Sequence, residues 1–293
     1  MKNFRTVLFA PGDDQKKTGQ VFTAGADAIV LDLEDAVTPE RKNIAREIVR
    51  EALPKPSPPV PSFIRVNPVS SPYILKDLEM VVHLPVAGIM LAKAESGEEV
   101  RRVDWLLNLL EQDRKITPGR LVIIPFIESA RGIERAEEIA GAATRVWCLA
   151  FGGNDYTMDI GVNYSQEGTE LFYARCRLVT ASRIAGIAPP LDTVNPNFKD
   201  IQALVKEVKQ VKQLGFQGKL VIHPVQVNPV NEVFTPTPDE IAWAKKVVDI
   251  FAQAQAKDAG VIQMEGKMVE LPVVRRAQQI LSLLEAIASK QVR

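Results

Sequence analysis

The sequence predicts a (β/α)8 barrel, or TIM barrel, followed by a C-terminal helix–hairpin–helix extension. The first observation is length: the chain has 293 residues, and one α/β barrel commonly takes about 250. The second is alternation, because short apolar runs are separated by longer segments with helical periodicity. Eight such repeats within roughly the first 225 residues indicate a closed barrel. An open doubly wound sheet is the alternative, since periodicity cannot show closure.

Most of the expected strands are continuous apolar runs, as is typical of parallel strands covered on both faces. No GxGxxG motif follows the first run, so a dinucleotide-binding fold has no support. The strands are expected at residues 6–10, 28–33, 63–67, 88–92, 121–127, 145–151, 188–193 and 220–223.

Helices are expected in the segments between these strands. One is expected at 130–140 and a longer one at 165–187. A third, at 198–214, repeats apolar residues at three- and four-residue spacing and ends before Gly215, a residue favoured just after a helix. The alternation of strand and helix predicts that residues 1–235 form the barrel.

Residues 236–293 form the expected extension. The segment opens with the helix-breaking sequence around Pro236 and Pro238. A helix at 241–256, a turn-rich hairpin at 260–271 and a final helix at 272–287 are expected to follow. This part is not of low complexity, so we expect it to fold and to act as a lid or an oligomer interface.

The composition excludes several classes of protein. Lys and Arg number 36, as do Asp and Glu, and the formal net charge is zero. A general nucleic-acid binder or a polybasic membrane binder would carry a basic excess. No apolar run approaches the roughly 18 residues of a membrane span, and the N-terminus does not have the pattern of a signal peptide. The two cysteines, Cys148 and Cys176, are interpreted as buried thiols, which favours a reducing compartment and a cytoplasmic location.

Polar residues gather where the expected strands end, which is where chemistry sits in a parallel α/β barrel. Glu128 and Asp155 each follow an apolar run. A carboxylate at the end of a buried strand is unfavourable unless it is paired or bound to a metal. Oxygen ligands on a rigid frame suit Mg²⁺; the alternative is a salt-bridged or helix-capping acid. Gly152 and Gly153 either allow a ligand to approach the backbone or form an ordinary turn.

Cationic and histidine side chains at the strand ends have competing interpretations. Arg65 suits a carboxylate or an enolate oxygen, or pairs with Asp32 or Glu34. Lys93 is a candidate Schiff-base lysine or an ion-pair partner. With only two histidines, a multi-histidine zinc or iron site is excluded. Of these, His223 ends the eighth strand and is a candidate for the pocket.

These strand-end motifs resemble the citrate lyase β-subunit and malyl-CoA lyase group of the HpcH/HpaI aldolase superfamily. The ordered set covers most of the chain and is more specific than any single motif. The matching stretches are RTVLFAPG (5–12), GADAIVLDLEDA (25–36), IRVN (64–67), GIMLAK (88–93), PFIESARG (125–132), FGGND (151–155), DTV (192–194), KLVIHPVQVNPVN (219–231) and GKMVELPVVRR (266–276).

The resemblance implies a TIM barrel, a Mg²⁺ ion and a substrate linked to CoA or an acyl carrier. It implies reversible cleavage of a 3-hydroxy-3-carboxyalkyl thioester and assembly as a trimer or hexamer. The metal-binding acids of the family fall on Glu128 and Asp155, and its substrate-binding arginine falls on Arg65. Glu34 and Asp35 match the acidic motif beside the metal, where they are expected to contact its waters.

One position departs from the family pattern. Malyl-CoA-lyase-like members use a tail aspartate that reaches a neighbouring subunit's site, and the matching residue here is Glu270. Its extra methylene would displace the carboxyl by about 1 Å, so lyase activity would persist, weaken or shift towards thioester hydrolysis. The alternative is that Glu270 is a solvated tail residue.

The leading hypothesis is a Mg²⁺-dependent carbon–carbon lyase of malyl-, citramalyl- or citryl-thioesters. The alternatives are a thioester hydrolase on the same scaffold, a non-catalytic CoA-binding relative, and a CoA-independent aldolase. Catalytic roles are expected for Arg65, Glu270 and Asp35. Basic residues near the first two strand ends, Lys16, Lys17, Arg41 and Lys42, either bind CoA phosphates or form a solvated helix face. The binding residues expected are Arg65, Glu34, Lys93, Gly152, Gly153, Asn154 and Lys16.

Overall fold

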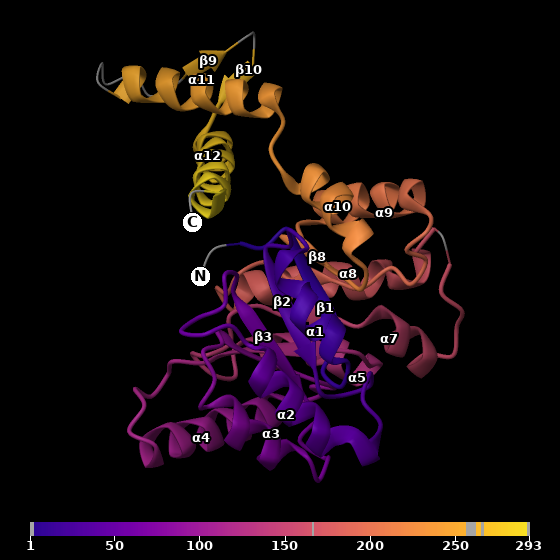
Figure 1. Cartoon of the computed structure of the whole chain (residues 1–293). Coiled ribbons are helices and arrows are strands. Elements are labelled where there is room, and N and C mark those ends of the chain that lie inside the picture. The colour runs from indigo at the N-terminus through magenta and orange to yellow at the C-terminus, as the bar shows by residue number, and fades with distance from the viewer. Residues whose placement is uncertain (1–2, 166, 256–261, 265–266, 292–293) are drawn as a thin grey trace. The chain divides into compact units, whose positions relative to one another are not determined.

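A computed structural model describes residues 3–165, 167–255, 262–264 and 267–291. Within these ranges, eight parallel strands pair in sequence order, and β1 pairs with β8 to close a barrel (Figure 1). The predicted (β/α)8 fold is therefore confirmed, and the open sheet is wrong. The strands are β1 Thr6–Pro11, β2 Ala28–Asp32, β3 Ser62–Val66, β4 Gly88–Leu91, β5 Val122–Ile127, β6 Ala150–Phe151, β7 Leu191–Asp192 and β8 Gly218–Val221.

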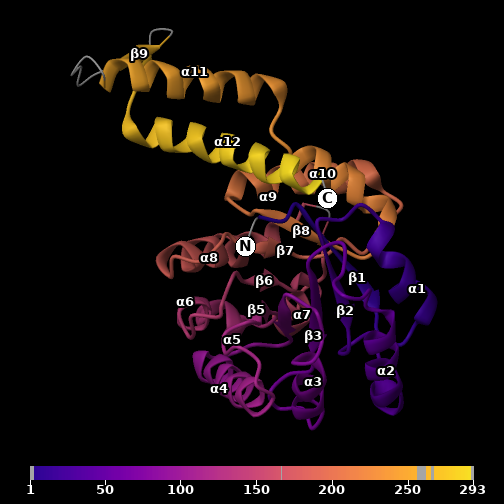
Figure 2. The same cartoon turned by 60° about the vertical axis from the view of Figure 1, so that its left-hand side comes forward.

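The helices of the barrel lie around the strands (Figures 1 and 2). Local sequence sets several of their ends. Helix α4 begins at a capping box, in which the Ser96 hydroxyl accepts from the Glu99 N–H and the Glu99 carboxylate accepts from the Ser96 N–H. The α-helices are α1 Gln15–Gln20, α2 Lys42–Ala52, α3 Ile74–Val81, α4 Gly97–Asp113, α5 Ala130–Glu134, α6 Ala136–Ala140, α7 Gly153–Asp159, α8 Phe172–Ile184, α9 Ile201–Leu214 and α10 Val227–Phe234.

Some predicted elements are longer than those observed. The sixth and seventh strands have two residues each. In the range expected for the sixth strand, Val146 forms only an isolated bridge with Ile123. The helix expected at 165–187 begins at Phe172, after Gly168 adopts a left-handed φ of 63° and a short 3-10 turn follows. The helix expected at 130–140 is two helices that meet at Arg135.

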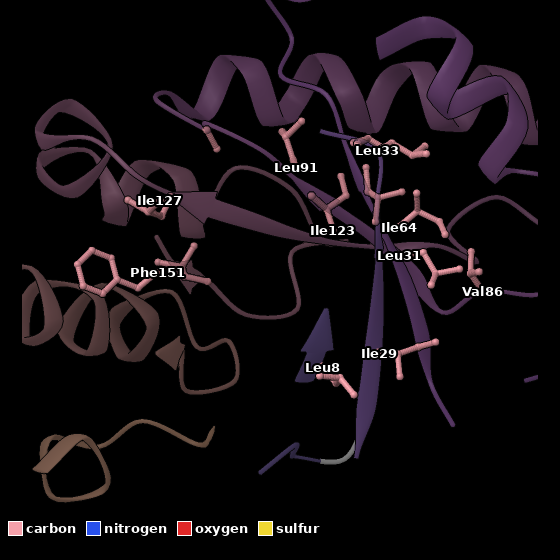
Figure 3. Packing of buried hydrophobic residues seen from close by; sticks show 14 of the residues in the cluster. Leu8, Ile29, Leu31, Leu33, Ile64, Val86, Leu91, Ile123, Ile127 and Phe151 are labelled. Atoms are coloured by element: carbon pink, nitrogen blue, oxygen red, sulfur yellow. The ribbon is translucent and has the colours of Figure 1, made fainter. Parts of the chain in front are cut away.

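Two layers of apolar side chains form the core. Successive side chains of a strand point to opposite faces. Val30 belongs to the barrel interior, where Phe4 packs edge-on against Trp147 with ring centroids 4.8 Å apart. Leu31 belongs to the layer between strands and helices, part of which Figure 3 shows. The alternation therefore directs Asp32, the next residue, into the barrel.

A buried network of charges lies between the last two strands and their helices. Arg175 of α8 forms two hydrogen bonds with Asp192, at 2.8 and 3.1 Å, and one with Glu207 of α9, at 2.6 Å. Lys219 of β8 lies 2.6 Å from Asp192 and 3.1 Å from Glu207. Asp192, the last residue of β7, is thus held in a structural network of ion pairs.

Because of this network, we expect the free energy of unfolding to decrease as the pH falls into the acid range. Burial tends to raise the pKa of Glu207, but Lys219 and Arg175 outweigh it and lower the pKa to about 2. Because the unfolded value is about 4.3, the stabilisation is complete above that value and is lost as the pH falls towards 2. Glu207→Gln should lower the free energy of unfolding by about 3 kcal/mol at pH 7 and by less at pH 3.

Urea denaturation at the two pH values measures this difference. Glu51→Gln, at an exposed position on α2, should leave the free energy of unfolding unchanged. A Glu207→Gln variant that is as stable as the unaltered protein at both pH values would contradict the network's role.

The chain divides into two compact units, and the second begins at Thr235. It comprises α11 Pro238–Gln255, an antiparallel hairpin of β9 Ile262–Met264 and β10 Lys267–Val269, and α12 Leu271–Gln291. Its helices share a core that includes Ala244, Val247, Val274 and Ala277. Residue 256 of the expected helix, and residues 260–261 and 265–266 of the expected hairpin, lie outside the described residues. No helix among those described is long and apolar enough to cross a bilayer.

Candidate functional site

A cavity of about 390 Å³ opens at the C-terminal ends of the barrel strands. Its lining combines polar and apolar residues. The polar residues include Asp32, Asp35, Arg65, Asn154 and Asp155, which with Gly152 come from strands β2, β3 and β6 or the residues after them. The apolar residues include Phe9, Pro11, Phe126, Val194 and Ile222.

Arg65 lies among acidic side chains and over the rings of Phe9 and Phe126, with its guanidinium carbon 5.5 and 5.7 Å from their centroids. Its guanidinium donates to both carboxylate oxygens of Asp32, at 2.7 and 2.6 Å, in a bidentate pair. Its Nη1 lies 3.2 Å from Glu34 Oε2 and 3.9 Å from Glu128 Oε1. Burial opposes the charge, but Asp32 and the other acids raise the pKa of Arg65, so it stays protonated. The ion pair foreseen as an alternative is present, and Arg65 also lines the cavity.

Asp32 holds the backbone of the segment that follows β2, residues 33–36, which we call the acidic turn because it contains Glu34 and Asp35. Its two oxygens accept hydrogen bonds from the N–H groups of Glu34, at 2.8 Å, and Ala36, at 3.2 Å. Strand alternation was the signal that could have identified Asp32 as an inward residue. From its place in the sequence, Asp32 is expected only as a partner of Arg65.

Lys93 pairs with the acidic turn from the end of β4. Its ammonium lies 2.5 Å from Glu34 Oε1 and 2.9 Å from Asp35 Oδ1, and its backbone has a φ of 50°, a left-handed conformation that is uncommon for lysine. Burial tends to lower the pKa of Lys93, but the hydrogen bonds to Glu34 and Asp35 raise it. A Schiff-base lysine must be neutral to attack, so the observed ion pairs disfavour that interpretation.

The two acids of the turn respond differently to this setting. Burial raises the pKa of Glu34. Burial also tends to raise the pKa of Asp35, but its hydrogen bonds with Glu34 and Lys93 lower it. Asp35 is therefore the more strongly ionised member of the pair.

Glu128 is a buried carboxylate just after the end of β5. It is 3% exposed, and among the groups that the structure describes neither of its oxygens has a hydrogen-bond partner. Burial, with the charges of Asp155 and Glu34, raises its pKa well above the usual range despite Arg65. Gly152 makes room for it, because a Cβ there would lie 2.5 Å from Glu128 Cγ. An unsatisfied buried carboxylate is what a hard cation would neutralise.

Asp155 lies in the first turn of α7 and is half-buried. Burial, and next the charge of Asp35, raise its pKa. The helix start is fixed by Gly153, whose N–H donates to Thr193 Oγ1 at 2.8 Å. Asn154 is exposed at the rim. Among the described residues, no three Cys, His, Asp or Glu side chains form a group that could hold a metal ion.

The basic residues near the first two strand ends are mostly engaged. Lys42 is buried and donates to the carbonyl oxygens of Leu33 and Glu34, at 2.7 and 2.8 Å, so its assignment as a phosphate ligand or as part of a solvated face was wrong. Arg41 pairs with Asp13 at 2.6 Å. Lys16 is exposed on α1.

Two further predicted residues belong to different parts of the chain: His223 follows β8, and Glu270 belongs to the second unit. His223 is exposed and stacks on Phe198, with ring centroids 4.6 Å apart, while its neighbour Ile222 lines the cavity. Glu270 is exposed and immediately precedes α12 in the second unit.

The comparisons with known proteins agree with one another. Residues 5–224 match the family model described as HpcH/HpaI aldolase/citrate lyase. The chain is 36% identical to the citrate lyase subunit beta of Haemophilus influenzae, over 96% of this chain and 97% of that protein. It is 32% identical to the human mitochondrial citramalyl-CoA lyase, over 98% and 87% of the two chains.

A solved structure gives the same result. CitE from Mycobacterium tuberculosis, in complex with magnesium, acetoacetate and coenzyme A, superposes with a TM-score of 0.78. It shares 26% identity, with 96% of this chain and 98% of that chain covered.

Proposed function

Because the chain belongs to the HpcH/HpaI aldolase/citrate lyase family, we propose that it is a Mg²⁺-dependent lyase of 3-hydroxy-dicarboxylic acyl thioesters. Malyl-CoA, citramalyl-CoA and citryl-thioester are the proposed substrates. The products are a 2-oxo acid and an acetyl-type thioester, and the reverse reaction joins them. The observation that carries the proposal is the buried carboxylate of Glu128, which has no hydrogen-bond partner among the described residues and lies 3.9 Å from Arg65 Nη1.

Glu128 and Asp155 are the proposed protein ligands of the ion, and Glu34 and Asp35 the proposed partners of its water molecules. Bound Mg²⁺ would supply Lewis-acid stabilisation of the negative charge on the substrate's oxygens. The pKa values of both carboxyl groups are raised, so their charged forms are unfavourable without a cation. A bound Mg²⁺ would be the positive neighbour that favours those charged forms, which supports this assignment. Gly152 contributes by leaving space for the Glu128 side chain.

In the proposed lyase reaction the substrate loses one proton from its hydroxyl group, and the enolate product gains one proton on carbon. A base takes the proton of the 3-hydroxyl group, and the carbon–carbon bond breaks to leave the carbonyl of the 2-oxo acid. The electron pair passes into the thioester as an enolate, which is then protonated on carbon. Arg65 is proposed to donate hydrogen bonds to the enolate oxygen. Its bidentate pair with Asp32 fixes the plane of the guanidinium before substrate binds.

Further groups are proposed to bind the substrate. They are Lys93, which follows β4, and Gly152, Gly153 and Asn154, which follow β6; Gly152 and Asn154 line the cavity. Lys16 is an exposed cation on α1 that is proposed to bind an anionic carrier. Glu270 is proposed as the acid/base, supplied by a neighbouring copy within a homotrimer or hexamer. This assignment rests on the resemblance of its motif.

Glu270→Gln should lower kcat by about 10²-fold or more, because a positioned acid/base contributes 10²–10⁴-fold. Mg²⁺ affinity should stay unchanged, since the residue is not a proposed ligand. Glu270→Asp should retain activity because it keeps a carboxyl group. Steady-state assays of 2-oxo acid formation measure both, with exposed Glu285→Gln on α12 as control. Full activity in Glu270→Gln would exclude the acid/base role.

A panel assay tests the proposed function. The purified chain, with Mg²⁺, is incubated with malyl-, citramalyl- and citryl-thioesters, and products are identified by mass spectrometry. The proposal predicts equal amounts of 2-oxo acid and acetyl-type thioester from at least one substrate. Free thiol with an intact hydroxy-diacid would identify a hydrolase instead. Tight thioester binding without turnover, unaffected by Glu128→Ala, would identify a non-catalytic relative.

A further inference from the structure

A buried hydrogen-bond network, which we call the brace, lies behind the acidic turn. It consists of Lys42, Arg46, Asn67 and Asp77, from α2, the end of β3 and α3. All four are buried, and Asp77 is fully inaccessible. None of these side chains has a role in the mechanism proposed above.

The brace contacts the turn through one carbonyl group in particular. Leu33 O accepts hydrogen bonds from Lys42 Nζ, at 2.7 Å, and from Asn67 Nδ2, at 3.1 Å. Lys42 Nζ also donates to Glu34 O at 2.8 Å. Asp32 accepts hydrogen bonds from the N–H groups of Glu34 and Ala36. The backbone of the turn is therefore held on both sides, by Asp32 at its N–H groups and by the brace at its carbonyl groups.

The rest of the brace fixes Asn67. Asp77 Oδ2 accepts from the side-chain amide of Asn67, at 2.6 Å, and from its backbone N–H, at 3.0 Å. Asp77 Oδ1 accepts from Arg46 Nε at 2.7 Å. The carboxylate therefore orients the Asn67 amide so that its N–H can reach Leu33.

The turn does not need Asn67 or Lys42 merely to satisfy its carbonyl groups. Leu33 O has two donors from the brace, and Glu34 O also accepts from the Val37 N–H at 3.0 Å. Loss of either side chain leaves each carbonyl with at least one donor. The duplication points to a function other than satisfying buried polar atoms, namely restricting where the turn lies.

We propose that Asn67 and Lys42 are positioning residues that hold Glu34 and Asp35 in place for the divalent cation and for Arg65. The inference rests on the proposed function. It resembles the general behaviour of outer groups around metal sites, whose loss typically lowers metal affinity 10- to 100-fold. Neither residue is proposed to touch substrate.

Asn67→Leu is the decisive variant, because it removes the donor without changing charge or greatly changing size. Binding of Mn²⁺ to the full chain, followed by electron paramagnetic resonance, should show a Kd raised about 10-fold or more. Unfolding in urea should stay cooperative. Excess Mg²⁺ should restore most of the lost kcat, which a merely destabilised protein would not show.

Lys42→Met tests the same proposal with an opposing electrostatic effect. Removing a positive charge near the site would by itself tighten Mn²⁺ binding. Weaker binding in Lys42→Met therefore supports positioning, and Lys42→Arg should restore the affinity. Lys76→Met, at an exposed position on α3, is the matched control and should bind Mn²⁺ as the unaltered chain does.

The outcomes separate this inference from the proposed function. Unchanged Mn²⁺ affinity in Asn67→Leu, or tighter binding in Lys42→Met, would overturn the positioning role while leaving the lyase proposal intact. If Asn67→Leu does not fold, Lys42→Met and Lys42→Arg decide the question in the same way. Absence of Mn²⁺ binding in the unaltered protein would overturn both.

Discussion

Glu128→Gln should abolish lyase activity and yet leave the protein as stable as before, or more stable. A buried charge without hydrogen-bond donors is unfavourable, and Glu128 has no such partner among the described residues. Replacing it with a neutral group of the same size should raise the free energy of unfolding by about 1–3 kcal/mol. Loss of the metal ligand should lower kcat at least about 10³-fold, since Lewis-acid stabilisation is worth several kcal/mol.

Glu111 provides a matched control, for which the change in the free energy of unfolding should have the opposite sign. It is equally buried, but it pairs with Arg145 at 2.5 Å and accepts from the Gly119 N–H at 2.8 Å. Glu111→Gln should therefore lower the free energy of unfolding by about 3–5 kcal/mol. Urea denaturation and calorimetric Mg²⁺ titration of both variants measure the contrast. A large loss of stability in Glu128→Gln, with metal binding retained, would mean that Glu128 is a structural residue.

Arg65→Lys should fold but turn over substrate about 10²–10³-fold more slowly, the usual effect of losing a donor to a developing oxyanion. Lysine keeps the positive charge near Glu34 and Glu128, but it cannot form the two parallel hydrogen bonds with Asp32. The group that should face the substrate is then no longer held in one plane.

Arg65→Met removes the positive charge as well as the hydrogen bonds, so comparing it with Arg65→Lys separates the effect of the charge from that of the bidentate geometry. It leaves Asp32, Glu34 and Glu128 without their shared cation, which should lower the free energy of unfolding by about 3–5 kcal/mol. Circular dichroism during urea denaturation and steady-state kinetics measure the two variants, and exposed Arg50→Lys on α2 is the control. Activity of Arg65→Lys within a few fold of the unaltered protein would exclude the oxyanion role.

The sequence was sufficient to predict the barrel because its strands are continuous apolar runs, buried on both faces. It did not reveal where β6 and β7 begin. Both are limited by pairing with neighbours that lie far away in the sequence, and apolar character continues beyond the ladder. Likewise, no local pattern showed that Arg175, Asp192, Glu207 and Lys219 meet.

Several residues that follow the expected strands in the sequence meet at the mouth of the barrel. Arg65, Asp155, Gly152 and Asn154 do line one cavity, with Glu128 within 3.9 Å of Arg65. Lys42 was misassigned because proximity to a strand end does not reveal side-chain direction. Asn67 was noted only as part of a motif, since its partners Leu33 and Asp77 lie on other elements.

A crystal structure of the chain with Mg²⁺ and pyruvate tests the central claim most directly. The proposal predicts Mg²⁺ with one carboxylate oxygen each from Glu128 and Asp155 at about 2.0–2.1 Å. It also predicts pyruvate oxygens on the same ion, with Arg65 beside them. An ion bound elsewhere, or pyruvate bound while Glu128 contacts no metal, would contradict it.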